Sequence, residues 1–208
     1  MDGVFMKKIW KRMVFLTVAV VCFYTGGLLA DQRTLQQELI RIHVVAASDS
    51  CEDQNMKLQV RDAVLESLQQ ALSDATDVDQ AKAYIQAHLP QIEARANAIL
   101  RELGAGDRAV VTFSEEAFPL REYETFSLPA GVYESLRITI GDGEGKNWWC
   151  VIFPSLCAGR SGDETADIAA GAGFSEGLSA ALTGEGGYRI RFYCLDLLGK
   201  IENFFFGD

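Results

Sequence analysis

The sequence predicts an α+β protein with a mainly antiparallel sheet, two or three helices packed on one face of that sheet, and an N-terminal signal or anchor helix in front of it. Three observations carry this prediction. An uncharged apolar run lies near the N-terminus, apolar residues recur at helical spacing between residues 51 and 103, and the period changes to two between residues 109 and 153. A strand, then helices, then a run of strands is the order typical of the α+β class.

The N-terminal segment has the composition of an export signal. The basic cluster KKIWKR (residues 7–12) precedes residues 13–30, MVFLTVAVVCFYTGGLLA, which carry no charge. This arrangement is typical of a signal peptide or of a retained membrane anchor. The small residues Thr25, Gly26 and Gly27 permit a signal peptidase to cut after Gly27. A cut after Ala30 is less suitable, because Leu28 would then occupy position −3, where a small residue is preferred. Cleavage and retention both stay open.

Residues 31–208 are expected to form a single globular domain, because this length suits one well-buried core. The segment carries 15 basic and 28 acidic groups, a net charge of −13. Such a domain is repelled by nucleic acid and by anionic lipid, so no nucleic acid partner is expected. Contact with a membrane is expected only through the N-terminal segment, if that segment stays uncleaved.

The first part of the domain is predicted to be one strand followed by helices. Residues 39–47, LIRIHVVAA, predict a strand because they are β-branched and apolar. Acidic residues three positions after Asp49 and Ser50 indicate a helix start near Cys51, and apolar residues at intervals of four continue to about Leu72. Residues 78–103 keep helical spacing, but Pro90 predicts a break or a restart within them.

The second part predicts strands at residues 109–113, 119–126, 131–140 and 147–153, separated by Pro or Gly turns. Residues 158–187 are rich in glycine, small residues and acids, and they predict a mobile loop or a segment that only a partner orders, with a weak helical pattern at 168–182. Residues 188–193 alternate as a strand does, and an apolar, aromatic tail follows from Leu195 to Phe206.

Export allows the cysteines outside the apolar run to oxidise. These are Cys51, Cys150, Cys157 and Cys194, an even number with three possible connectivities. A Cys–His nucleophile pair is the alternative use, with Cys150 or Cys157 beside His43. No signature of a thiol-enzyme family surrounds either cysteine, and two cysteines separated by six residues in an exported chain are more often a disulfide or two buried thiols. Cys150 and Cys157 are the candidate disulfide.

The spacing of the cysteine, histidine and glycine residues does not match a metal or cofactor site. Zinc needs three or four ligands at short spacings, and Cys150 to Cys157 is C-x6-C with no histidine nearby. Residues 141–146, GDGEGK, lack the glycine and the Ser or Thr of a phosphate loop, and their acids oppose phosphate binding. No catalytic residue, metal ligand or cofactor is therefore predicted.

Two groups of residues remain as candidates for a binding surface. Asp49 and Asp53, with Glu52, can bind a cation or simply cap the helix, and Arg41 and His43 lie just before them on the predicted strand. Trp148 and Trp149 occupy successive strand positions and therefore point to opposite faces of the sheet. Both can be core residues, or one can anchor a partner, because tryptophan is frequent at the centre of interfaces.

Long blocks of the chain resemble a known family. RIHVVAASDSCEDQNMKLQVRDAV (residues 41–64), FPLREYETFSLPAGVYESLRITIGDGEGKNWWCVIFPSLC (118–157) and RFYCLDLLGKIENFF (191–205) are similar to the stage II sporulation protein R family of endospore-forming Firmicutes. Together with the export segment, the resemblance covers most of the chain. Residues 158–187 resemble nothing we can name.

The resemblance implies a signalling protein without enzymatic activity. Members of the family are exported from the forespore into the space between the two membranes of the sporulating cell. There they trigger a membrane-embedded aspartic protease, stage II sporulation protein GA, to process the sigma-E precursor. The expected partner is this receptor, and the candidate contact residues are Arg41, His43, Asp49, Asp53, Trp148 and Trp149. The alternative is an exported thiol hydrolase that uses Cys150 or Cys157 with His43.

Overall fold

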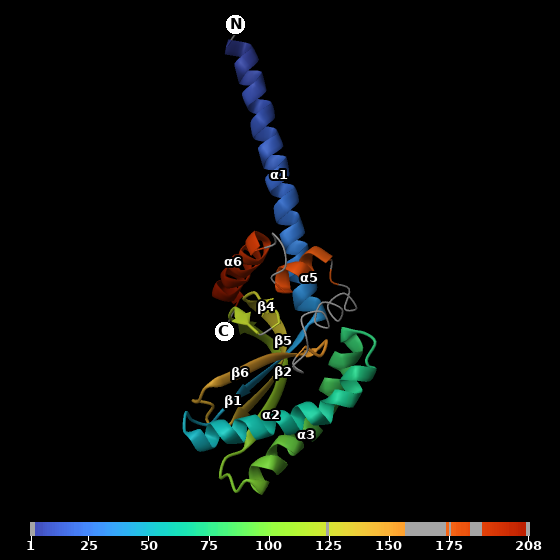
Figure 1. Cartoon of the computed structure of the whole chain (residues 1–208), viewed down its shortest axis with the longest axis vertical. Coiled ribbons are helices and arrows are strands. Elements are labelled where there is room, and N and C mark those ends of the chain that lie inside the picture. The colour runs from blue at the N-terminus through green and yellow to red at the C-terminus, as the bar shows by residue number, and fades with distance from the viewer. Residues whose placement is uncertain (1–2, 124, 157–173, 175, 184–188, 207–208) are drawn as a thin grey trace.

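A four-stranded sheet with helices on both faces forms the body of the protein, and a long N-terminal helix projects from one end of it (Figure 1). The structure is a computed structural model, and it describes residues 3–123, 125–156, 174, 176–183 and 189–206. The predicted loop at 158–187 lies mostly outside these residues, and so does Cys157.

The sheet has the order β2-β5-β1-β6, with β1 at Ile40–Val45, β2 at Ala109–Phe118, β5 at Gly131–Ile140 and β6 at Asn147–Phe153. β1 runs parallel to β5 and antiparallel to β6, and β2 is antiparallel to β5. All six residues of β1 are buried. The predicted α+β class with a mainly antiparallel sheet is thereby confirmed, and β2 and β6 are its edge strands.

Helices α2 (Cys51–Asp74) and α3 (Val78–Glu102) cover the first face of the sheet (Figure 1). Each starts where a side chain caps it: Ser50 accepts a hydrogen bond from the Asp53 N–H, and Asp77 accepts one from the Gln80 N–H. The predicted helix starting near Cys51 is confirmed. The core between these helices and the sheet contains Ile40, Ile42, Val44, Val60, Val64, Leu68, Ile85, Ile92, Leu100, Leu136, Ile138 and Cys150.

The second face has a core of its own, supplied by the end of α1 (Gly3–Glu38), by α5 (Glu176–Thr183) and by α6 (Arg189–Phe206). The sequence analysis did not foresee this second layer of helices. Its core contains Leu28, Leu35, Leu39, Phe118, Phe126, Leu128, Tyr133, Val151, Leu178 and Leu195. Helix α1 therefore runs through the expected boundary at residue 30 and adds its last turns to the domain.

Helix α1 is also the one helix among the described residues that is long and apolar enough to cross a membrane. Its segment Ile9–Glu38 has a mean hydropathy of 2.1 over the most apolar window, of which 6% is buried. A core helix of a soluble domain would bury most of such a surface. The observation fits the predicted signal or anchor segment.

Three expectations about elements were wrong. Pro90 does not break α3. Proline has no N–H to bind the Gln86 carbonyl, but Gln86 and Pro90 both lie on the exposed side of the helix, where water can bind that carbonyl. Residues 119–126 do not form one strand but contribute to a short hairpin of β3 (Arg121–Glu122) and β4 (Ser127–Leu128). Residues 188–193 were expected to be a strand, yet α6 begins at Arg189, because six alternating residues cannot distinguish a strand from the start of an amphipathic helix.

Close packing of α6 on the sheet depends on Gly199. A Cβ atom at this position would lie 1.5 Å from the Ala130 carbonyl oxygen, so no side chain fits without moving the helix. We expect Gly199→Ala to lower the free energy of unfolding by about 1–3 kcal/mol, as overpacking does. Denaturant unfolding of the detergent-solubilised chain, followed by tryptophan fluorescence, measures the change.

The matched control is Gly106→Ala, where nothing lies within 4 Å of the added carbon and the backbone is not left-handed. An equal effect of the two substitutions would show that α6 can move away from Ala130 at no cost.

Candidate functional site

The second face of the sheet carries a polar network centred on His43. Strand β1 points Ile42 and Val44 into the first core and turns Arg41 and His43 to the second face. Nδ1 of His43 lies 2.7 Å from Oε1 of Glu116 on β2, and Nε2 lies 2.8 Å from Oδ1 of Asn147 on β6. Both ring nitrogens therefore have partners, and the three strands are joined across the face.

Glu116 is the point at which this network converges. Besides His43, its carboxylate accepts hydrogen bonds from Ser135 Oγ at 2.8 Å and from Arg137 Nη1 at 3.0 Å. Burial by itself raises the pKa of the Glu116 carboxyl, but the hydrogen bonds from His43 and Ser135 and the charges of His43 and Arg137 outweigh burial and lower the pKa. Glu116 is thus an anion held in place by three side chains from β1 and β5.

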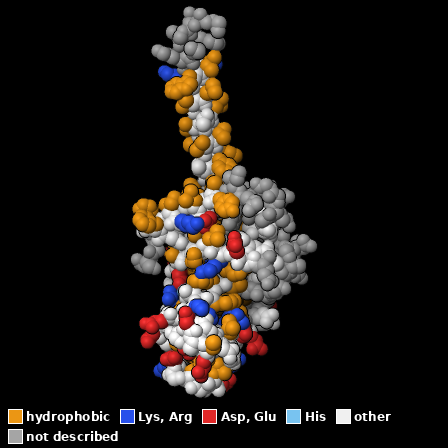
Figure 2. Space-filling view, turned by 60° about the vertical axis from the view of Figure 1, so that its left-hand side comes forward, with side chains coloured by type: hydrophobic (Ala, Val, Ile, Leu, Met, Phe, Trp, Pro, Cys, Tyr) orange, Lys and Arg blue, Asp and Glu red, His pale blue; other side chains and the backbone are white. Residues whose placement is uncertain are grey.

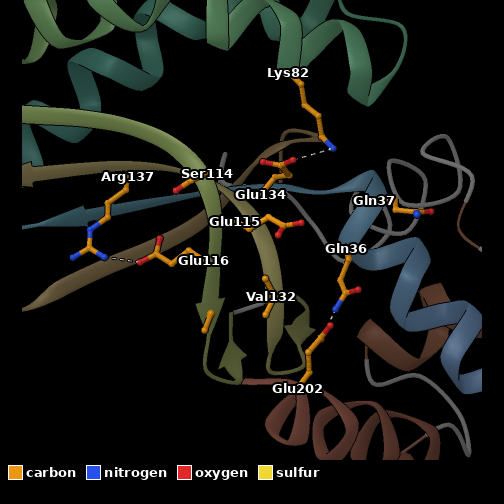
Figure 3. A pocket seen from close by; sticks show the side chains of 11 residues that line it. Gln36, Gln37, Lys82, Ser114, Glu115, Glu116, Val132, Glu134, Arg137 and Glu202 are labelled. Atoms are coloured by element: carbon orange, nitrogen blue, oxygen red, sulfur yellow. Dashed lines mark hydrogen bonds and ion pairs between the residues drawn. The ribbon is translucent and has the colours of Figure 1, made fainter. Parts of the chain in front are cut away.

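The network opens into a groove along the edge strand β2, which we call the β2 groove (Figure 3). The groove has a volume of about 670 Å³. Its walls come from the last turns of α1, the first turns of α3, strands β2 and β5, and α6. The residues that line it are Gln36, Gln37, Lys82, Ser114, Glu115, Glu116, Ala117, Val132, Glu134, Arg137 and Glu202.

The β2 groove is acidic overall, with four carboxylates and two cationic side chains. Glu134 pairs with Lys82 at 3.5 Å, Glu116 pairs with Arg137, and Glu202 accepts hydrogen bonds from Gln32 and Gln36 of α1. Glu115 is exposed, and no partner for it exists among the described residues. Figure 3 shows its side chain in the groove between these pairs. The groove therefore presents one free negative charge next to an edge strand.

Arg41 is fully buried on the same face. Its guanidinium lies 4.0 Å from the ring centre of Phe118 and 5.0 Å from that of Tyr133, and Nη2 donates to the Tyr123 hydroxyl at 3.1 Å. Nε and Nη1 have no hydrogen-bond partner among the residues that the structure describes. Aromatic rings stabilise a desolvated guanidinium, so they replace part of its lost hydration. Arg41 has no exposed surface and reaches a partner only if this region opens.

The two tryptophans point to opposite faces, as their spacing predicts. Trp148 packs against the first core, with the Arg61 guanidinium 4.8 Å from its ring centre. Trp149 lies on the second face, where it stacks on His43 at 5.2 Å and carries Arg121 at 3.5 Å on its ring. Both are half-buried, so each keeps surface that a partner can contact. Their binding role stays a prediction.

Asp49 and Asp53 lie at the start of α2, away from His43 in the hydrogen-bond network. Asp49 accepts a hydrogen bond from the Lys146 N–H at 2.7 Å, and Asp53 accepts one from the Ser48 hydroxyl. Gly145 fits in this contact because it has no Cβ, which would lie 2.3 Å from the Ser48 carbonyl oxygen. Asp49 thus joins the β5–β6 turn to the connection between β1 and α2, and Asp53 joins that connection to the first turn of α2. The described residues hold no cluster of three or more ligands for a metal ion.

The cysteines do not assemble with His43 where the structure describes them. Cys150 is buried in the first core and is disulfide-bonded, whereas His43 faces the second core. Cys22, Cys51 and Cys194 are free. Because Cys157 lies outside the described residues, its pairing with Cys150 stays a prediction.

Sequence reasoning missed the acidic residues of β2. Alternation along residues 109–118 places Glu116 on the same face as Phe118, which is a readable signal. The pairing of β2 with β5, and of β5 with β1, brings Glu116 to His43 from 73 positions away. A single sequence does not display that strand order.

The fold and the site define an α+β domain behind an apolar N-terminal helix, with an acidic groove at an open sheet edge. The profile of a family described as "Stage II sporulation protein R" matches residues 36–162. Stage II sporulation protein R of Bacillus subtilis (strain 168) is 35% identical over 159 residues, which cover 71% of each chain. No solved structure matches the chain. The chain belongs to the stage II sporulation protein R family, and its role is in sporulation.

Charge removal at Glu116 should weaken the fold in a pH-dependent way. Because folding lowers the pKa of this carboxyl from its ordinary value of 4.5, its contribution is present above that pH and is lost as the pH falls. We expect Glu116→Gln to lower the free energy of unfolding by about 1–3 kcal/mol at pH 7, and by less at pH 4. Denaturant unfolding at several pH values measures the difference.

Glu66→Gln is the control, since Glu66 is exposed on α2 and lies 3.9 Å from Arg95. It should change stability little at either pH. A Glu116→Gln effect that stays constant from pH 7 to pH 4 would contradict the ionised network.

Proposed function

We propose that this protein is an exported signal of sporulation that triggers a membrane-embedded aspartic protease, stage II sporulation protein GA, to process the sigma-E precursor. It acts in the space between forespore and mother cell, and it acts as a ligand and not as an enzyme. A ligand of this kind works by binding the active state of its receptor more tightly than the inactive state.

The observation that carries the proposal is the family match over residues 36–162. This range contains all four strands of the main sheet and both helices of its first face. Two features of the chain support it. Helix α1 has the length and composition of an export or anchor segment, and the polar network around His43 contains no nucleophile placed to use the histidine as a base.

We further propose that the receptor binds at the β2 groove. Among the described residues, strand β2 pairs only with β5. Asn97 and Glu93 of α3 already bind the backbone of Ala109 and the Val111 N–H on its other edge, so the part of that edge beyond Val111 is what can offer backbone groups to an extended segment. The free carboxylate of Glu115 stands beside that edge, and it favours a segment with a basic side chain. The groove also touches the last turns of α1, through Gln36 and Gln37.

The test is co-expression of the chain, the receptor and the sigma-E precursor in a host that lacks all three. We expect precursor processing only when the chain is present. Glu115→Lys should lower processing about tenfold at limiting protein, because reversal of one interfacial charge costs roughly 1.4 kcal/mol or more. An immunoblot of the processed sigma factor is the readout.

Glu102→Lys is the matched control, because Glu102 is exposed at the end of α3, about 30 Å along that helix from Lys82. It should leave processing unchanged. If the unchanged chain produces no processing, the signalling role is contradicted. If Glu115→Lys gives as much processing as the unchanged chain, the receptor contact lies elsewhere.

The candidate disulfide separates this proposal from a thiol hydrolase. If Cys150 pairs with Cys157, closing a loop of eight residues stabilises the fold by about 2–3 kcal/mol. Cys150→Ser, Cys157→Ser and the double variant should then lose the same amount in denaturant unfolding. Loss of signalling with one cysteine alone, at unchanged stability, would instead indicate a nucleophile.

A further inference from the structure

Helix α6 has a buried side that fixes it on the domain. Leu195 is fully buried, the Asp196 carboxylate accepts a hydrogen bond from the Ala130 N–H at 3.2 Å, and Asn203 donates to the Phe118 carbonyl at 2.8 Å. With Gly199 against Ala130, these contacts determine which side of the helix faces outward.

The outward side is apolar. Its large apolar side chains recur at intervals of four, four, three and one, so they form one stripe on a helix of 3.6 residues per turn. The stripe consists of Tyr193, Leu197, Ile201, Phe204 and Phe205, and it is 48–83% exposed. Outside α1, the other exposed large apolar side chains among the described residues are Leu58 and Val110. A contiguous exposed apolar stripe of this kind marks an interaction surface.

The stripe lies at the level where α1 would leave a membrane. The uncharged run 13–30 of α1 is about 27 Å long, close to the roughly 30 Å hydrocarbon core of a bilayer. Glu202, within the stripe's last turns, accepts hydrogen bonds from Gln32 and Gln36. These glutamines come roughly 3 Å and 9 Å after the end of the run, which is the depth of the lipid headgroups and their outer edge.

The pictures agree with this placement. Figure 1 shows α6 beside α1 at the end of the domain from which α1 projects. Figure 2 shows hydrophobic side chains along α1 and again at the adjoining end of the domain. Tyrosine suits the headgroup region because its ring is apolar and its hydroxyl is polar, and phenylalanine and leucine are typical of the buried side of interfacial helices.

We propose that α6 is an interfacial helix that inserts its apolar stripe into the headgroup region of the bilayer leaflet from which α1 emerges. The domain is then held to the membrane at two places, by α1 across the bilayer and by α6 along its surface. This fixes the β2 groove, which α1 and α6 both line, at a constant height above the membrane. The inference requires that α1 stay attached, and it does not require the proposed receptor.

The test uses the full chain in nanodiscs of phosphatidylethanolamine and phosphatidylglycerol, at one chain per disc and without receptor. The free cysteines Cys22, Cys51 and Cys194 are replaced by serine, and single cysteines are introduced as Leu197→Cys, Phe204→Cys or, as a control, Val110→Cys. Each is labelled with an environment-sensitive fluorophore. Lipids brominated near the headgroup then quench only labels at that depth.

We expect quenching of the labels at positions 197 and 204, several-fold stronger than at position 110, which lies at the start of β2 and is 56% exposed, close to the 59% of Leu197. Unfolding measurements on each labelled chain show that the fold is retained. Water-like emission and no quenching at 197 and 204 would overturn the inference. Emission that loses its water-like character only with two chains per disc would also overturn the inference, because it would show that a second copy covers the stripe.

Discussion

The central strand must bury Arg41 and His43, and the rest of the second face is arranged around that constraint. A polar side chain under a sheet costs several kcal/mol unless it finds partners there. His43 finds Glu116 and Asn147 on two other strands, and Arg41 finds the rings of Phe118 and Tyr133 and the Tyr123 hydroxyl. The network therefore fixes the relative positions of β1, β2, β5 and β6, and it leaves Glu116 ionised at the wall of the β2 groove.

The same face divides into a covered half and an open half. Helices α1, α5 and α6 cover the end of the sheet that holds Arg41, and their core includes Phe118, Tyr133 and Val151. At the other half, Glu116 and Arg137 reach the groove. Because Glu202 of α6 holds α1 through Gln32 and Gln36, the groove is joined to α1 by direct hydrogen bonds. A partner bound there would meet a surface of defined shape and charge.

Much of the fold was predictable from local patterns. The strands at 131–140 and 147–153 appear with the expected bounds, and α2 begins at the predicted Cys51. Local patterns failed where a short segment was ambiguous, as at Arg189–Tyr193, or where solvent exposure removed the expected cost, as at Pro90. Of the candidate site residues, His43 lies in the polar network and Trp149 stacks on it. Asp49 instead binds the β5–β6 turn, and Asp53 binds Ser48 just before α2.

The sequence by itself determined the apolar N-terminal helix, the α+β class, the opposite orientation of Trp148 and Trp149, and the family, because each depends on residues close together or on long matching blocks. Only the tertiary structure decided that Glu116 meets His43, that Glu115 lies in the β2 groove with no partner among the described residues, and that α6 turns an apolar stripe outward beside α1. Those features depend on strand order and on which side of a helix is buried, and both are set by contacts between residues far apart in the chain.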